Sequence, residues 1–146
     1  MNEVTFWQLS PTERLKEWRS FRISLQDLTI EEQVEHTVKW WMKTPIDRNT
    51  IDPYDSSNWP DPWQLIHSGK FDENAIALAM AYTLHYLGLE CKVLLVQDQS
   101  RNLITLVTVI KEEYVINYNY GEVNKQEVLD NIEILNSWDL EQLTQR

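Results

Sequence analysis

The sequence predicts an α+β domain in which a buried central helix packs on an antiparallel sheet. Two observations lead to this prediction. The stretch from Asp72 to Gly88 is apolar almost all round, which is typical of a helix enclosed by other elements. Three runs rich in aliphatic and β-branched residues follow it, separated by short polar turns, as in an antiparallel meander. The 146 residues, 42% of them apolar, are enough for one ordinary hydrophobic core, so we expect a single domain over residues 1–146.

Two helices are expected before the central helix. Residues 10–13 (Ser-Pro-Thr-Glu) combine a capping serine, a proline in the first helical position and a glutamate that completes a capping box. Thr29 begins a second capping box, and the helix after it should end before Pro45. A long polar loop over residues 44–62 then leads to a short helix at 63–68.

The central helix is expected to begin after Asp72 as its N-cap and to stop at Gly88. Strands are expected at residues 91–96, 103–110 and 114–118, with a tight hairpin at 111–113. The tail is expected to add a helical turn at 125–129, a short strand at 132–135 and a frayed end at 140–143.

Charge and composition exclude several classes of function. The formal net charge of −10 argues against general binding to nucleic acid or to anionic membranes. Cys91 is the only cysteine, so no internal disulfide forms and a reducing, cytoplasmic compartment is expected. The first ten residues lack the pattern of a signal peptide, and no apolar run approaches the ~20 residues of a membrane span.

The residues that could carry chemistry are few. His36, His67 and His85 lie far apart without metal-ligand spacing, so we expect no metal and no cofactor. Cys91 and His85 could form a thiolate pair, but Cys91 enters a buried strand, where a structural thiol is the default. Asp72 and the adjacent Glu73 are expected to cap the helix rather than to act as acid and base.

The order of helix, Gly88-Leu89-Glu90-Cys91, strand, turn, strand, hairpin and strand over residues 69–120 resembles the core of the transglutaminase-like, papain-related superfamily. The resemblance implies a cysteine at the start of the central helix, a histidine in the second strand and an aspartate or asparagine at the third. Asp72 or Glu73 stands at the first position, Thr105 or a neighbour within residues 103–107 at the second, and Asn117 near the third. The resemblance therefore implies a pseudoenzyme that lacks Cys-His-Asp chemistry.

The aromatic pattern, with Trp18, with Trp40 and Trp41 before Pro45, and with Trp-Pro-Asp-Pro-Trp at 59–63, is similar to small uncharacterised proteins of tailed phages, including cyanophages. This similarity implies a role in virion structure or assembly, with phage structural proteins as partners, in the host cytoplasm or the virion.

The long loop contains the residues that we predict to contact a partner protein: Tyr54, Trp59 and Trp63. Long loops are often functional, and tryptophan is enriched at interfaces. The competing interpretation is that Trp59 and Trp63 are buried and only fasten the loop.

These observations favour a non-enzymatic phage protein on a catalytically inactive transglutaminase-like scaffold. Two alternatives stay open. The first is a divergent hydrolase or acyltransferase that depends on Cys91 or on carboxylates. The second is an acidic inhibitor of a nucleic-acid-binding protein, because acidic residues cluster in the tail.

Overall fold

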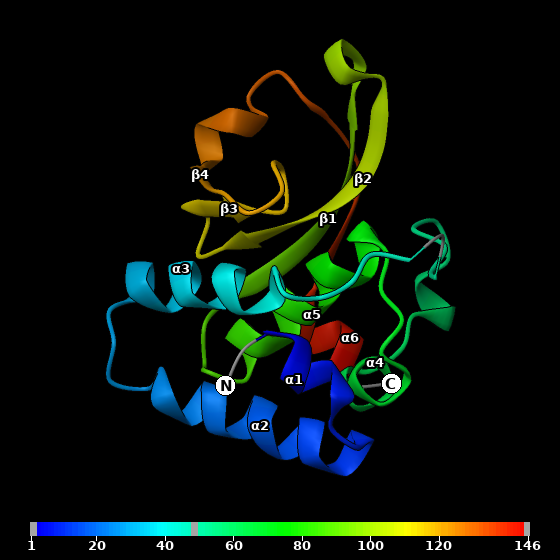
Figure 1. The fold of residues 1–146 in the computed structure, drawn as a ribbon. Coiled ribbons are helices and arrows are strands. Elements are labelled where there is room, and N and C mark those ends of the chain that lie inside the picture. The colour runs from blue at the N-terminus through cyan, green and yellow to red at the C-terminus, as the bar shows by residue number, and fades with distance from the viewer. Residues whose placement is uncertain (1–2, 48–49, 145–146) are drawn as a thin grey trace.

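The computed structural model describes residues 3–47 and 50–144 and confirms the predicted α+β architecture, with helices on one side of an antiparallel sheet (Figure 1). The elements in chain order are α1 (Glu3–Gln8), α2 (Pro11–Ser24), α3 (Ile30–Trp41), η1 (Ser56–Asn58), α4 (Pro62–Ser68), α5 (Glu73–His85), β1 (Cys91–Asp98), η2 (Gln99–Arg101), β2 (Leu103–Ile110), β3 (Tyr114–Ile116), β4 (Val123–Lys125), η3 (Gln126–Leu129), β5 (Glu133–Asp139) and α6 (Leu140–Thr144). Among the described helices, none is both long and apolar enough to cross a membrane.

The central helix is α5, and it is buried as predicted. Its residues from Ala75 to Leu84 are all buried. Thr83 on α5 accepts hydrogen bonds from the indole N–H of Trp18 on α2 and of Trp41 on α3, each at 3.0 Å. These two bonds satisfy two large aromatic side chains inside the core, and they fix both N-terminal helices against α5.

The sheet is larger than the predicted meander of three strands. Its order is β4-β3-β2-β1-β5, and every pair of neighbours is antiparallel. The tight hairpin at residues 111–113 is confirmed: Ile110 pairs with Tyr114, and Lys111 and Glu112 in the loop both have positive φ. The third strand ends at Ile116, two residues earlier than predicted, because Asn117 turns into the left-handed region.

The predictions for the two ends of the chain need correction. Residues 3–8 form α1, which the sequence did not predict; edge contacts of Phe6 with Trp40 and of Trp7 with Phe71 hold it against the body. In the tail, the strand expected at 132–135 runs from Glu133 to Asp139, and the residues expected to fray form α6. This longer strand completes the sheet beside β1.

Candidate functional site

Three polar side chains meet where α5 begins. Asn74 Oδ1 accepts hydrogen bonds from Thr105 Oγ1 at 3.2 Å and from the backbone N–H of Leu106 at 3.0 Å. Asn117 Nδ2 donates to the carbonyl oxygens of Leu106 at 3.1 Å and of Glu73 at 3.0 Å. Both backbone groups of Leu106 are thus satisfied beyond the end of the β2–β3 ladder, where no strand reaches them.

Asp72 is engaged in the same way. Its Oδ1 accepts the N–H of Ala75 at 2.7 Å, which makes it the N-cap of α5 as predicted. Its Oδ2 accepts the N–H groups of Thr50 at 2.8 Å and of Ile51 at 3.2 Å, so the same carboxylate also holds the long loop. Polar groups at this end of α5 therefore hold backbone in place.

The structure brings most of the predicted positions together but changes one assignment. The side chain that meets Thr105 belongs to Asn74, whereas the sequence placed Asp72 or Glu73 there. Glu73 is exposed and joins the cluster only through its carbonyl oxygen. Asn74 was overlooked because it reads as part of the first helical turn. The available signal was a polar residue directly before a run of ten buried positions.

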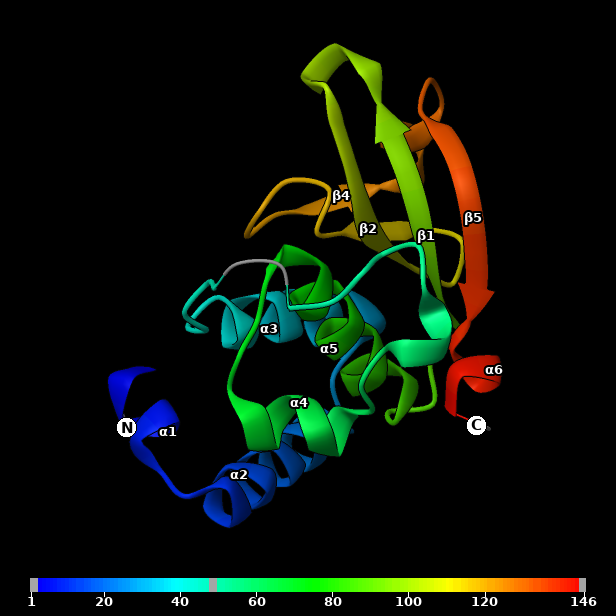
Figure 2. The same ribbon diagram turned by 90° about the vertical axis from the view of Figure 1, so that its right-hand side faces the viewer.

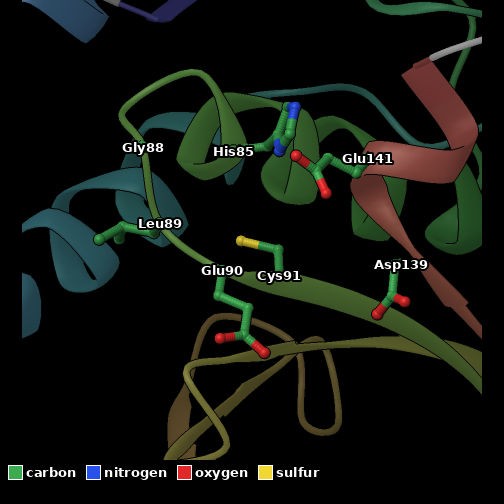
Figure 3. A pocket seen from close by; sticks show the side chains of 7 residues that line it. All are labelled: His85, Gly88, Leu89, Glu90, Cys91, Asp139 and Glu141. Carbon is green, nitrogen blue, oxygen red and sulfur yellow. The ribbon is translucent and has the colours of Figure 1, made fainter.

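A second group of side chains lines a pocket of about 490 Å³ at the opposite, C-terminal end of α5. It contains Cys91 at the start of β1, His85 in the last turn of α5, and the acids Asp139 and Glu141. Figure 3 shows Cys91, His85 and Glu141 among the side chains that line this pocket. Within the part of the chain that the structure describes, no hydrogen bond joins these three side chains.

The environment of Cys91 keeps the thiol protonated. The residue is 4% exposed, and burial raises the pKa of its thiol to about 12, with a smaller contribution from the negative charge of Glu90. Such a thiol attacks slowly unless a base removes its proton during the reaction. His85 is the histidine that lines this pocket. Cys91 and His85, which the sequence offered as a possible pair beside the default of a structural thiol, both line this pocket.

The three predicted partner-binding residues differ in exposure. Trp59 is buried, stacks edge-on against Trp138 at 4.6 Å and donates its indole N–H to the carbonyl of Asp52, so this side chain fastens the loop. Tyr54 and Trp63 are 63% and 46% exposed. That these two residues contact a partner protein stays a prediction.

The fold is shared with known structures. No family model matches the sequence, and no curated protein matches it. Solved structures of LapG from Legionella pneumophila superpose on 94% of this chain. One covers 82% of that chain with a TM-score of 0.72 and 14% identity. The calcium-bound form covers 84% with a TM-score of 0.73 and 14% identity, and an EGTA-treated form has a TM-score of 0.71 and 15% identity. The fold is transglutaminase-like.

This comparison corrects the functional prediction. LapG is a calcium-dependent cysteine protease of the transglutaminase-like family. The structures that this chain resembles are those of a protease, and the prediction of a non-enzymatic phage virion or assembly protein is therefore wrong. The named structures provide no link to phage. That prediction rested on the absence of a cysteine at the N-terminal end of α5. A cysteine, a histidine and acids lie at the C-terminal end of the same helix.

The calcium of the LapG structure raises the question of a metal site in this chain. Calcium takes six to eight oxygen ligands, mainly from carboxylates and carbonyls. Within residues 3–47 and 50–144, no group of three or more His, Cys, Asp or Glu side chains is arranged to hold a metal ion. The described residues therefore offer no cluster of carboxylates for calcium, and the chemistry below uses none.

Proposed function

We propose that this protein is a divergent cysteine-dependent hydrolase or acyltransferase, with Cys91 as nucleophile and His85 as general base. The observation that carries the proposal is the single pocket that holds Cys91, His85 and Glu141. Enzymes that transfer acyl groups through a thiol commonly combine a cysteine nucleophile, a histidine base and an acid that orients the histidine. The likeness in fold to a cysteine protease supports the reaction class.

In the proposed reaction, the Cys91 sulfur attacks the carbonyl carbon of an ester or amide. His85 accepts the thiol proton as the sulfur–carbon bond forms, because the protonated resting thiol requires a base in that step. Collapse of the tetrahedral intermediate breaks the bond to the leaving alcohol or amine, which takes the proton from His85. Water or a second nucleophile then releases the acyl group by the reverse sequence. In this proposal Glu141, which lines the same pocket, orients the imidazole ring.

The proposal is tested with p-nitrophenyl acetate, a small activated ester that needs no specificity pocket. Wild type should release p-nitrophenol with turnover, and Cys91→Ala should lose the protein-dependent rate by about 100-fold or more. Asn74→Ala is the matched control, because it alters the other end of α5 and leaves the Cys91 pocket intact. Equal rates for wild type and Cys91→Ala would overturn the proposal, whatever the control shows.

A further inference from the structure

β5 is the free edge of the sheet on the side of the Cys91 pocket. Among the residues that the structure describes, it pairs with β1 alone, and six of its seven residues are exposed. Figure 2 shows β5 as the outermost strand, with no element beyond it. Its sequence, Glu-Ile-Leu-Asn-Ser-Trp-Asp, contains neither proline nor lysine, which commonly protect exposed edges. An edge of this kind is a template for an added strand.

The sheet register shows which backbone groups point outward from this edge. Both backbone groups of Leu106 are bonded to side chains away from β1, so its pair with Leu95 is of the non-hydrogen-bonded kind. The two kinds of pair alternate along an antiparallel ladder. Leu94 therefore directs its backbone groups toward Val107 on β2, away from β5. Ser137 lies opposite Leu94 and directs its own N–H and C=O to the free edge.

One contact supports this orientation. The N–H of Ser137 donates to Asn136 Oδ1 at 2.8 Å, so it does not belong to the ladder with β1. Asp139, two residues further along, has the same orientation. The irregularity in the β1–β5 register lies between Leu95 and Val96, so the last residues of β5 form a regular edge.

Charge distinguishes between the strands that this edge could accept. Residues 126–144 contain no lysine or arginine and five acids, namely Glu127, Asp130, Glu133, Asp139 and Glu141. A second copy of this chain, paired edge to edge, would place acids against acids, which is unfavourable. A segment that carries lysine or arginine complements the edge.

The edge also leads to the pocket. Asp139 ends β5 and lines the cavity that contains Cys91, and Glu141 follows in α6 (Figure 3). A strand paired with residues 137–139 would reach Asp139 at the margin of this pocket. We propose that the free edge of β5 binds an extended, basic polypeptide segment as a sixth strand. That this segment is the substrate rests on the function proposed for the Cys91 pocket.

The test uses a capped eight-residue peptide of alternating lysine and valine, with binding measured by calorimetry in a Cys91→Ala background so that nothing is consumed. Ser137→Pro removes an outward N–H without touching the ladder to β1, and Ser137→Ala is the matched control that keeps this N–H. We expect Ser137→Pro to weaken binding at least 10-fold and Ser137→Ala to leave it unchanged. A peptide with glutamate in place of lysine should also bind at least 10-fold more weakly.

Hydrogen exchange keeps the test independent of how well the proline variant folds. The peptide should slow exchange of the Ser137 and Asp139 amides in a chain with native β5. The proposal would be overturned if the peptide did not bind or if it protected amides elsewhere in the chain. It would also be overturned if the peptide-free protein formed dimers that Ser137→Pro dissociates. Peptide binding without ester turnover would contradict the proposed enzymatic function and support the binding of a strand at β5. Ester turnover without peptide binding would support the enzymatic function and contradict the binding at β5.

Discussion

The two ends of α5 carry different kinds of polar group. At the N-terminal end, Asp72, Asn74 and Asn117 are hydrogen-bonded to backbone, and these bonds satisfy N–H and C=O groups that have no partner in a helix or a strand ladder. At the C-terminal end, Cys91 and His85 line a pocket without such bonds to each other. The comparison shows that polar residues at one end of a helix can serve the architecture, whereas the groups that we propose to react lie around its other end.

The largest effect on stability is expected at the N-terminal end. Asp72→Ala removes the acceptor of three backbone N–H groups and should lower the free energy of unfolding by about 1–3 kcal/mol. Glu73→Ala is the control, because its side chain is exposed; it should change stability by less than about 0.5 kcal/mol. Urea denaturation measures both. If the two variants were equally stable, the N-terminal end would not have the structural role assigned to it.

A smaller effect is expected from the titration of Cys91. Its folded pKa of about 12 lies above the ordinary value of 9.0, so the thiol contributes stability that is fully present below pH 9. Between pH 9 and 12 the unfolded chain loses this proton while the folded chain keeps it, and stability falls by up to about 1.4 kcal/mol per pH unit.

Cys91→Ala lacks this titration and isolates it from all other groups. Between about pH 8 and pH 10, the free energy of unfolding of wild type should therefore fall by about 1 kcal/mol more than that of the variant. Parallel pH profiles for the two proteins would show that the thiol is not shielded from water, and the contrast between the two ends of α5 would weaken.

The sequence was most informative where structure is local. The capping box at Thr29, the cap at Asp72 and the hairpin at Lys111 each depend on a few adjacent residues, and all three are present. β5 was predicted short because its exposed residues show no alternation of apolar and polar positions. Its length follows from pairing with β1, some forty residues away in the chain, which no local pattern encodes.

The same limit applies to the candidate site. Cys91 and His85 are close in sequence and were considered together, but their environment decides their role. The pocket also needs Asp139 and Glu141, which the β1–β5 pairing and α6 bring to the start of β1. Asn74 was missed because its role depends on a distant strand. β3 is too short to pair with Leu106 on β2, so the backbone N–H of Leu106 bonds to Asn74 instead.

The most direct test of the central claim is acylation of Cys91, measured by intact-protein mass spectrometry with p-nitrophenyl acetate. Because the chain has one cysteine, peptide mapping assigns any thioester without ambiguity. Wild type should acylate faster than free cysteine at neutral pH, although the raised pKa of the thiol alone predicts slower reaction. His85→Gln should slow acylation by about 100-fold or more, and the exposed control His67→Gln should not. Acylation no faster than free cysteine, or equal in both histidine variants, would contradict the account.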